Sequence, residues 1–571
     1  MIPQTPSRFK INVTHFLVAY RVWPFIIWLF LNIIWYISAH TYYYYNPTYA
    51  ISEFEWFNAR ATGHLINLNF AIILLPIARN SVFQKVVGLP FEVGLIYHKF
   101  LGCFIYLLAT FHGFSWYVYW AIIYFVNDNQ PYEDCYKACT FASAIQPVGI
   151  LGLLCWLLLT VMVFFAMPYW RRKKFELFYF IHHVFILIIG LAIVHSYLGQ
   201  NRTFATDLLL YYVIPGLCLY LFDRSVRFVR SNLIKQEFYS LEPQQGGLIC
   251  LKLARKNFKF APGQFCFLNI PTISRLQWHP FSITSSPSDD FLTFHIKAPP
   301  GDTWSRKLYT FCNQSESSKL NSGSLLRFSN AITVKCDGPY GNKFFDVVPD
   351  DIHRYFFICA GIGITPVISI INTIINYYQR KTAVSSSVPL KERIGFINLV
   401  WIVRFQYELA WFSLFLARLT EITKNNQAVL ARQQGIVIKV NLYVTKPSSK
   451  DTEHKLVTLL PDDYYGHLQE VSGRSLNSFT EDDIHFHADG FETDPGGREV
   501  TIDYRVGRPN ILTHFEDIRV EIAKHEWTTY PTRISTFVSV PEELEKQIAA
   551  ACKQYSDQDV KYVFSSETFM L

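Results

Sequence analysis

The chain has 571 residues, of which 50% are hydrophobic and 17% aromatic, and its formal net charge is +7 at pH 7. It has no long runs of lysine and arginine interleaved with aromatic residues, and this argues against nucleic-acid binding. The 11 cysteines form neither a CxxC pair nor the spacing of a zinc site. Apolar residues crowd into about the first 225 positions, whereas the remainder resembles a soluble α/β protein in composition. The sequence therefore predicts a membrane-embedded part followed by a soluble part.

Six apolar segments are long enough to cross a bilayer core, which takes about 20 residues of helix. The basic run Arg171–Lys174 and the arginines from Arg224 onward place their loops in the cytosol by the positive-inside rule. We therefore expect a multi-pass protein of the plasma membrane or an endomembrane, with a cytosolic N-terminus and C-terminal half. Cys135, Cys139 and the glycosylation sequon at Asn201 then fall in outward loops. The six segments lie near residues 16–38, 60–78, 98–124, 147–167, 176–197 and 208–223.

Histidines within these segments are the main chemical signal of the membrane part, because ionisable groups in a bilayer core are costly and usually functional. His98 and His112 are 14 residues apart in the third segment, and His182 and His195 are 13 residues apart in the fifth. At about 1.5 Å per residue, each pair spans roughly 20 Å along the membrane normal. Neutral imidazole is a common axial ligand of haem iron. We therefore predict two haems, an inner one ligated by His98 and His182 and an outer one ligated by His112 and His195.

The alternative role of these histidines is hydrogen bonding to neighbouring helices, but two pairs at matched depths favour haem ligation. Residues 14 apart return to nearly the same helix face, whereas 13 residues leave the second histidine more than about 90° away. We therefore expect a kink or a change of winding in the fifth segment, with Gly190 as its candidate position. His183 does not remove this need, since a 12-residue step also misses the face.

Several short motifs in the membrane part occur in the same order as in a known family. They are Ala59-Arg60-Ala61, Leu74-Leu75-Pro76, Arg79-Asn80, His98-Lys99 and His182-His183. Together they resemble the NADPH oxidase family of the ferric reductase superfamily, and the resemblance covers nearly the whole chain. It implies a six-helix transmembrane haem domain over residues 1–232. An FAD-binding antiparallel β-barrel over 233–345 and an NADPH-binding α/β domain over 346–571 would follow, in the manner of ferredoxin-NADP reductase, with an insertion near 445–500.

The soluble part contains a stretch of nine residues, His279–Pro287, that resembles the FAD motif of this family. The stretches around it alternate apolar and polar residues as strands do, so an ordinary β-barrel core is the alternative interpretation. The resemblance implies that hydroxyl groups of this motif hold flavin oxygens and that the segment from His295 to Lys297 contacts the diphosphate. The turn cluster Asp337–Gly341 would lead into the nicotinamide domain. The residues expected to bind FAD are His279, Pro280, Phe281, Ser282, Ile283, Thr284, Ser285, His295, Lys297, Gly338 and Pro339.

A glycine-containing turn follows the apolar strand Tyr355–Cys359 and precedes a helical stretch. Small residues there allow backbone N–H groups at a helix N-terminus to approach a pyrophosphate. The resemblance further implies that Arg404 and Arg508 grip the 2′-phosphate of NADPH, a dianion that suits a guanidinium fork. For each arginine alone, a solvated surface charge is the alternative. The residues expected to bind NADPH are Gly361, Gly363, Thr365, Pro366, Arg404 and Arg508.

Some positions depart from the family pattern. Ser539-Val540-Pro541 replaces the Cys-Gly-Pro that lies beside the nicotinamide, and we expect the valine to crowd the cofactor. Phe569 corresponds to the aromatic residue that covers the flavin, although two residues follow it. Trp116 replaces a second outer histidine of the third segment. We hypothesise that His64, one helical turn from Arg60, substitutes for it near the outer haem.

These residues predict a transmembrane NADPH oxidase that passes electrons from cytosolic NADPH through FAD and two b-type haems to O2, producing superoxide on the far side. Arg60 would stabilise the developing anion. One alternative is a transmembrane ferric or cupric reductase, which the 13-residue spacing and Arg60 disfavour. Another is a catalytically impaired haem-containing scaffold, for which Ser539-Val540 is the only support. The resemblance also implies cytosolic activators and a small membrane partner subunit.

Overall fold

The computed structural model divides the chain into two units, Met1–Val229 and Arg230–Leu571, and each is described by itself. The predicted features at Cys135, Cys139, Asn201 and Phe569, and nearly all of the insertion near 445–500, lie outside the described residues. The residues that the structure describes are 13–45, 54–79, 91–126, 146–200, 208–233, 237–244, 246–256, 258–320, 332–341, 344, 354–384, 394–424, 435–446, 454–459, 500–524 and 532–566.

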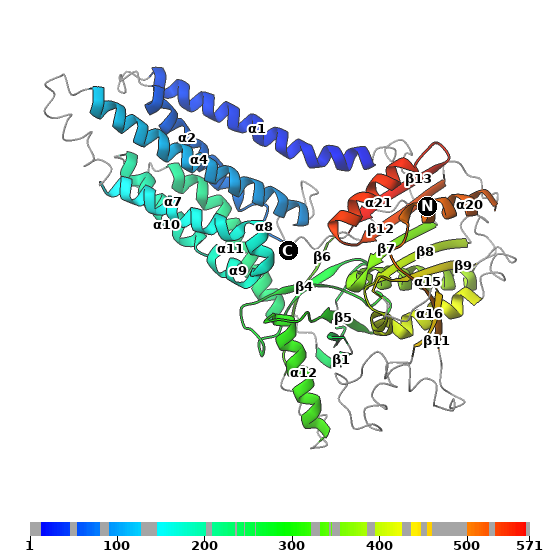
Figure 1. Ribbon diagram of the computed structural model, residues 1–571. Coiled ribbons are helices and arrows are strands. Elements are labelled where there is room, and N and C mark those ends of the chain that lie inside the picture. The colour runs from blue at the N-terminus through cyan, green and yellow to red at the C-terminus, as the bar shows by residue number, and fades with distance from the viewer. Residues whose placement is uncertain are drawn as a thin grey trace. The chain divides into compact units, whose positions relative to one another are not determined.

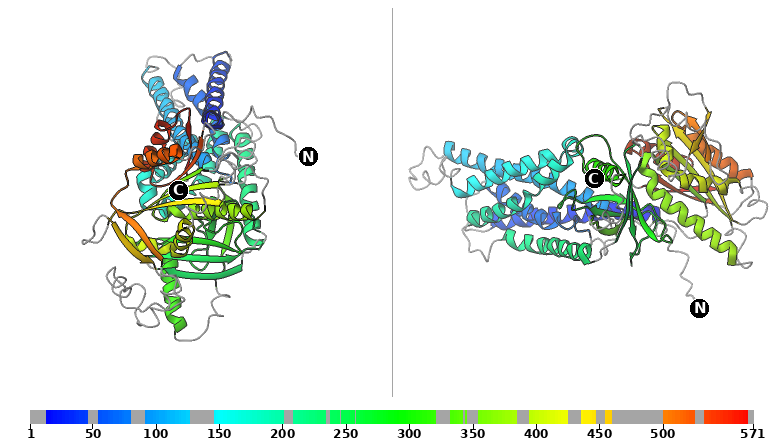
Figure 2. Two further views of the ribbon diagram at one scale, coloured as in Figure 1. Left: turned by 90° about the vertical axis from the view of Figure 1, so that its right-hand side faces the viewer. Right: turned by 90° about the horizontal axis from the view of Figure 1, so that it is seen from below.

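The first unit is a bundle of long helices that run alongside one another (Figures 1 and 2). Helix α1 packs on α2, α2 packs on α4, α4 on α7, and α7 on α10. The helices are α1 (Val13–Tyr45), α2 (Phe54–Ile73), α4 (Phe91–Val126), α7 (Pro147–Ala166), α8 (Pro168–Lys173), α9 (Phe175–His182), α10 (Phe185–Gln200) and α11 (Leu208–Leu233).

Five helical segments within the described residues are long and apolar enough to cross a membrane. The second predicted segment also forms a helix, α2, but it is not among the five. The reason is its composition, since α2 contains Arg60, His64, Asn67 and Asn69. Asn67 and Asn69 are buried, so α2 turns part of its polar surface toward other residues of the bundle. The five segments are Pro24–Tyr42, Val93–Val118, Pro147–Ala166, Phe175–Leu198 and Leu209–Ser231.

A hydrogen-bond network between α1 and α2 provides partners for the buried amides of Asn32 and Asn69. The indole Nε1 of Trp28 donates to Oδ1 of Asn69 at 2.8 Å. Nδ2 of Asn69 donates to Oδ1 of Asn32 at 2.7 Å and to the carbonyl of Leu65 at 2.8 Å. A buried polar group without a partner would cost about 1–3 kcal/mol. The network therefore explains how α2 keeps polar residues in the interior of the bundle.

The fifth predicted segment contains a break at His183 and Val184, between α9 and α10. The N–H of His183 bonds to the carbonyl of Phe180 at 3.2 Å, and that of Val184 bonds to the carbonyl of Ile181 at 3.0 Å. In such 3₁₀ winding each residue turns by about 120° rather than about 100°. Thirteen residues of regular helix fall short of four full turns, so the extra rotation moves the second histidine back toward the face of the first. The expected change of winding is present, but Gly190 was the wrong position, because it lies within α10.

The second unit begins with two three-stranded antiparallel sheets, β1-β2-β5 and β4-β3-β6, that enclose an apolar core. Strand β5 alternates buried and partly exposed residues along its length, as a strand with one face on the core should. Helix α12 (Trp304–Leu320) contributes Trp304 and Leu308 to this core. The strands are β1 (Glu237–Gln244), β2 (Leu248–Ala254), β3 (Phe265–Asn269), β4 (His279–Ser282), β5 (Phe291–Lys297) and β6 (Lys335–Tyr340).

A seven-stranded sheet with the order β10-β11-β9-β8-β7-β12-β13 follows. All neighbouring strands are parallel except β10, which is antiparallel to β11. The strands are β7 (Arg354–Ala360), β8 (Ile394–Val403), β9 (Gly435–Val444), β10 (His454–Leu459), β11 (Val500–Val506), β12 (Thr532–Ser539) and β13 (Val560–Ser566). The helices are η5 (Gly361–Gly363), α15 (Ile364–Val384), η7 (Gln406–Phe412), α16 (Ser413–Lys424), α20 (Ile511–Lys524) and α21 (Glu542–Gln554).

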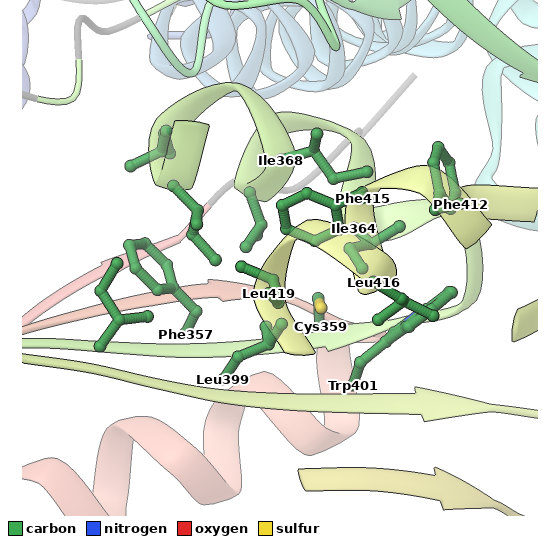
Figure 3. Close-up of a cluster of buried hydrophobic side chains, with 14 of the residues drawn as sticks. Phe357, Cys359, Ile364, Ile368, Leu399, Trp401, Phe412, Phe415, Leu416 and Leu419 are labelled. Carbon is green, nitrogen blue, oxygen red and sulfur yellow. The ribbon is translucent and has the colours of Figure 1, made fainter. Parts of the chain in front are cut away.

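Helices cover both faces of this sheet. Figure 3 shows side chains of α15 and α16, such as Ile368 and Leu419, packed over Phe357 of β7 and Trp401 of β8. Helices α20 and α21 build a second core on the opposite face, around Phe515. The predicted order of a helical membrane domain, an antiparallel barrel and an α/β domain is therefore confirmed.

His514 of α20 provides a test of this second core, since its side chain is only 1% exposed. Its Nε2 lies 3.0 Å from the hydroxyl of Tyr443, and burial lowers the pKa of His514 to about 4. The charges of Arg505 and Lys439 lower this pKa further, and Asp517 opposes them.

The unfolded chain therefore binds more protons than the folded chain between about pH 6.5 and pH 4, and stability is lost as pH falls through this range. At pH 5 the loss from this residue is on the order of 2 kcal/mol. We expect His514→Gln to unfold at a temperature that falls less between pH 7 and pH 5 than that of the unsubstituted protein. Thermal unfolding of the purified full chain measures this difference, and identical pH profiles would contradict the assignment.

Candidate functional site

The four histidines predicted to ligate iron come together as two pairs. The ring centroids of His98 and His182 lie 5.9 Å apart, and those of His112 and His195 lie 6.3 Å apart. A metal ion between two imidazole nitrogens, with bonds of about 2.0–2.1 Å, separates the ring centroids by roughly 6 Å. Each pair is therefore spaced as two axial ligands of one iron would be.

Backbone carbonyls set the orientation of three of these four rings. A carbonyl oxygen only accepts hydrogen bonds, so the Nδ1 atom that contacts it carries the proton and Nε2 keeps its lone pair. Nε2 is then the nitrogen available to a metal. The three contacts join Nδ1 of His98 to Ile73 at 3.1 Å, Nδ1 of His112 to Ala59 at 2.7 Å and Nδ1 of His195 to Val148 at 2.8 Å. Nδ1 of His182 is buried and has no hydrogen-bond partner among the described residues.

Two glycines provide the room for the outer pair of rings. A Cβ added to Gly152 would lie 2.9 Å from Cε1 of His195, closer than real Cβ atoms approach. A Cβ added to Gly63 would lie 3.2 Å from Cε1 of His112. The rings thus lie directly against the backbones of α7 and α2. Sequence reasoning missed both glycines, although a glycine inside an apolar helix was a usable signal of a close approach.

The outer pair has Trp116 and Arg60 beside it. The guanidinium of Arg60 lies 5.7 Å from the ring centroid of Trp116, and Trp116 makes an edge-to-face contact with His112 at 6.5 Å. Arg60 and His64 both interact electrostatically with His112. Arg60, His64 and Trp116 are therefore gathered around the ligand that we predict for the outer haem.

The predicted FAD motif forms strand β4 and the segment after it. The ring of His279 stacks on Trp304 with centroids 4.7 Å apart, and Phe281 packs on the same indole at 5.9 Å. Burial lowers the pKa of His279 to about 4, so its ring is neutral at physiological pH. Nε2 of His279 and Nε1 of Trp304 are buried without a hydrogen-bond partner in the described part of the chain. Two polar groups are thus available to a ligand, and Trp304 was missing from the predicted site.

The other residues of the motif serve the barrel with their side chains. Ile283 is fully buried in the core, and Ser282 is buried. Oγ of Ser285 accepts a hydrogen bond from the N–H of Thr293 at 3.1 Å, and Oγ1 of Thr284 lies 3.1 Å from Nδ1 of His295. Pro280 lies in β4 beside them. These side chains therefore take part in the packing and hydrogen bonding of the barrel itself.

His295 and Lys297 of β5 point to the α/β domain. The ring of His295 lies 4.7 Å from that of Phe412, and burial lowers its pKa to about 3, with a smaller contribution from Lys252. Nζ of Lys297 lies 2.7 Å from Oε1 of Glu408. The expected FAD contacts of these residues would occur beside contacts with η7.

Gly338 and Pro339 lie in β6, at the edge of the barrel. A Cβ added to Gly338 would lie 2.6 Å from Sγ of Cys266, so only glycine fits against β3 at this point. Gly338 therefore has a packing role in the barrel.

The predicted pyrophosphate turn lies between β7 and α15 as η5. Gly361 has φ +51°, and its carbonyl accepts a hydrogen bond from Nε1 of Trp401 at 3.0 Å. A Cβ added to Gly363 would lie 2.5 Å from the carbonyl oxygen of Ser539. Ser539 therefore lies directly against this turn, next to the N-terminus of α15 where Thr365 and Pro366 begin the helix.

The arrangement of strands explains why these residues meet. Strand β12 is paired with β7, with Ser539 opposite Cys359. The chain moves from β7 through β8 to β9 on one side, whereas β12 and β13 lie on the other. The turn and Ser539 thus lie where the strand order reverses, outside the carboxyl ends of parallel strands, which is the usual ligand-binding position of such sheets.

Val540 packs against the hydrophobic cluster that α20 and α21 form, which includes Phe515 and Val538. This contact argues against the crowding of the cofactor that we expected from the sequence.

Arg404 and Arg508 are exposed at the same edge of the sheet. Arg404 follows β8, and its carbonyl accepts the N–H of Lys446 at 2.9 Å. Arg508 follows β11, where the N–H of Gly507 bonds to the carbonyl of Val444 at 2.8 Å. The edge that carries η5 and Ser539 therefore also carries both predicted phosphate-binding arginines.

Three family models match the chain in succession. A ferric reductase like transmembrane component matches residues 62–193, an FAD-binding domain matches 235–344, and a ferric reductase NAD binding domain matches 353–544. Among solved structures, a ferredoxin-NADP+ reductase from Plasmodium falciparum is similar over 58% of this chain and 96% of its own, with 12% identity and a TM-score of 0.31.

Curated relatives cover most or all of the chain. A superoxide-generating NADPH oxidase heavy chain of Dictyostelium discoideum is 28% identical over 69% of this chain and 76% of its own length. A respiratory burst oxidase homolog of Arabidopsis thaliana is 26% identical over 100% of this chain, which spans 65% of that relative. Ferric reduction oxidase 4 of Arabidopsis thaliana is 27% identical over 61% of this chain and 45% of its own length. The chain therefore has a ferric-reductase-like transmembrane component followed by an FAD-binding and a NAD-binding domain, and it is similar to NADPH oxidases over most of its length.

Proposed function

We propose that this protein is a transmembrane NADPH oxidase that transfers electrons from cytosolic NADPH to O2 across the membrane and produces superoxide. The observation that carries the proposal is the spacing of the two histidine pairs, 5.9 and 6.3 Å between ring centroids, in a chain with FAD-binding and NAD-binding domains. We also propose that the N-terminus and the domains at 233–345 and 346–571 are cytosolic, after a haem domain at 1–232.

His98 with His182 and His112 with His195 would hold the two b-type haems, because their rings fit one iron each and three of them present Nε2. Bound haem supplies one-electron transfer, and bound FAD accepts hydride from NADPH. Because His112 and His195 would both hold the outer iron, O2 would react beside this pair rather than as a ligand of the iron. O2 would therefore be reduced at the edge of the outer site, near Arg60.

Arg60 would stabilise the negative charge that develops on O2 at this edge. Its contact with the ring of Trp116, which also touches His112, supports a position beside the outer site. His64 would take the role of the histidine that the family has in place of Trp116. Further expectations, which rest on the family resemblance alone, are cytosolic activators and a small membrane partner subunit.

In the soluble domains, the stack of His279 on Trp304 would support one side of the FAD site with neutral rings. The N-terminus of α15, beside Gly361 and Gly363, would receive the pyrophosphate of NADPH. Ser539, which lies against Gly363, would be a small polar neighbour of the nicotinamide.

A transmembrane ferric reductase is the second candidate, since ferric reduction oxidase 4 is among the relatives. One assay on the purified protein separates the candidates, namely a dithionite-reduced spectrum combined with NADPH-driven dye reduction. We expect a haem spectrum and dye reduction that superoxide dismutase abolishes. Turnover of an iron chelate that resists dismutase would favour the reductase, and a spectrum without any turnover would favour a haem-containing scaffold.

The outer site predicts different effects for three histidine substitutions. His112→Ala should lower the haem-to-protein absorbance ratio to about half, because it removes one ligand of one pair. His64→Ala should keep both haems and slow O2 reduction. His183→Ala is the matched control, since Nδ1 of His183 bonds to the carbonyl of Tyr179, outside both pairs. Full haem content in His112→Ala would contradict the ligand assignment, and an unchanged O2 rate in His64→Ala would contradict the role of His64.

The two arginines at the sheet edge predict the choice of nicotinamide cofactor. Removing a hydrogen bond to a charged group costs about 1.5–3 kcal/mol, so Arg404→Ala and Arg508→Ala should each raise KM for NADPH roughly 10- to 100-fold. KM for NADH should change little, because NADH lacks the 2′-phosphate. Arg519→Ala is a suitable control, since Arg519 pairs with Asp557 on the surface. Equal increases in KM for NADPH and NADH would contradict the assignment of these arginines to the 2′-phosphate.

A further inference from the structure

Glu408 of η7 is a buried carboxylate with contacts in two domains. Its residue is 2% exposed. Oε2 accepts hydrogen bonds from the backbone N–H groups of Arg404 at 2.7 Å and Phe405 at 3.4 Å. Oε1 accepts a hydrogen bond from Nζ of Lys297 at 2.7 Å, 111 residues away in the barrel. One side chain thus joins strand β5 to the turn that follows β8.

The partners of Glu408 satisfy a charge that would otherwise be costly to bury. A buried carboxylate is tolerated when it is paired and its oxygens accept hydrogen bonds, and Glu408 meets both conditions. The ammonium of Lys297 lies at a more open position, with its side chain 38% exposed. An ammonium has three donors, so the bond to Glu408 leaves donors for a second acceptor.

The surroundings of Glu408 hold η7 against the barrel. Nζ of Lys297 lies 4.7 Å from the ring centroid of Trp411, and His295 packs on Phe412. A Cβ added to Gly246, which has φ +74°, would lie 2.4 Å from the ring of Tyr407. The barrel backbone therefore approaches η7 closely at Gly246, and two side chains of β5 contact the same helix.

Lys297 and Arg404 are the residues that we assign to two different phosphate groups. Lys297 is expected at the FAD diphosphate and Arg404 at the 2′-phosphate of NADPH. Glu408 directs the ammonium group of Lys297 and holds the backbone N–H of Arg404. We propose that Glu408 is a positioning residue through which FAD diphosphate binding and NADPH 2′-phosphate binding both depend on one carboxylate. The proposal rests on the proposed function, since it assumes both cofactor sites.

A purely structural cap of η7 is the competing explanation. Glu408 is the third residue of η7 and does accept a hydrogen bond from the backbone N–H of Phe405, the residue before the helix, as the acidic residue of a capping box would. Loss of a cap would lower stability without distinguishing between ligands. Loss of a positioning contact would weaken ligands that carry the relevant phosphate more than ligands that lack it. The two explanations therefore differ in ligand selectivity.

A second set of contacts between the barrel and the α/β domain provides a matched control. Oγ of Ser369 donates to the carbonyl of Ser285 at 2.7 Å, and Oγ1 of Thr373 lies 3.1 Å from Oγ of Ser286. These contacts belong to α15 and involve neither Lys297 nor Glu408. Thr373→Val removes one of these contacts between the domains. It therefore tests whether any weakened domain interface changes ligand selectivity as Glu408→Gln should.

The experiment uses the purified full chain and three probes, namely FAD, 2′,5′-ADP and 5′-ADP, which lacks the 2′-phosphate. We expect Glu408→Gln to weaken the binding of FAD and of 2′,5′-ADP by about tenfold each, as the loss of a charge-assisted hydrogen bond should. Binding of 5′-ADP should change less than about twofold. Thr373→Val should leave the ratio of the two ADP affinities unchanged.

A double substitution tests the route through Lys297. In a Lys297→Met background, Glu408→Gln should weaken FAD no further, because the two effects share one contact. Should Glu408→Gln fail to fold, Glu408→Asp keeps the charge but draws the carboxylate back by one methylene, and it should shift the same ratios in the same direction.

The outcomes separate this proposal from the proposed function. If the unsubstituted protein binds FAD and prefers 2′,5′-ADP but the Glu408 variants match it, the positioning role is wrong and the function stands. Equal weakening of both ADP ligands in the Glu408 variants also overturns the proposal, in favour of a structural cap. If the unsubstituted protein binds neither FAD nor 2′,5′-ADP, the proposed function fails and this inference fails with it.

Discussion

Each proposed iron site depends on a hydrogen bond on the far side of an imidazole ring. Where a backbone carbonyl holds Nδ1, Nε2 keeps its lone pair and is the nitrogen available to a metal. The acceptors for His112 and His195 come from α2 and α7, so these helices must lie within hydrogen-bonding reach of the ligand helices. Glycine at positions 63 and 152 permits this approach. The close packing of α2 and α7 against the ligand helices follows from that requirement.

The low hydropathy of α2 comes from its side chains. A helix that carries Arg60, His64 and two asparagines cannot be as apolar as a helix that faces lipid. The amide of Asn69 is satisfied in part by α1, where Asn32 and Trp28 bond to it. In the soluble unit, the position of the predicted nucleotide contacts is set by the backbone. They gather where β7 and β12 end and the strand order reverses.

Sequence reasoning went furthest where a feature repeats along one helix or one motif. The depths of His98, His112, His182 and His195 were enough to pair them as the structure does. The position of the winding change was not predictable in the same way, since it depends on backbone hydrogen bonds at His183 and Val184. The contact of Lys297 with Glu408 was missed because it joins segments that are distant in the chain and have no local pattern in common.

The break between α9 and α10 has a consequence for how this helix tolerates insertions and deletions. A tightened turn between two functional positions can absorb the loss of one residue by changing its rotation, while the flanking helices keep their facing sides. The number of residues between the two histidines can then vary. Homologous chains with different numbers of residues between them can still present the same pair of ligands. Alignments across this region should therefore allow a gap at the tightened turn, rather than shift one of the histidines out of register.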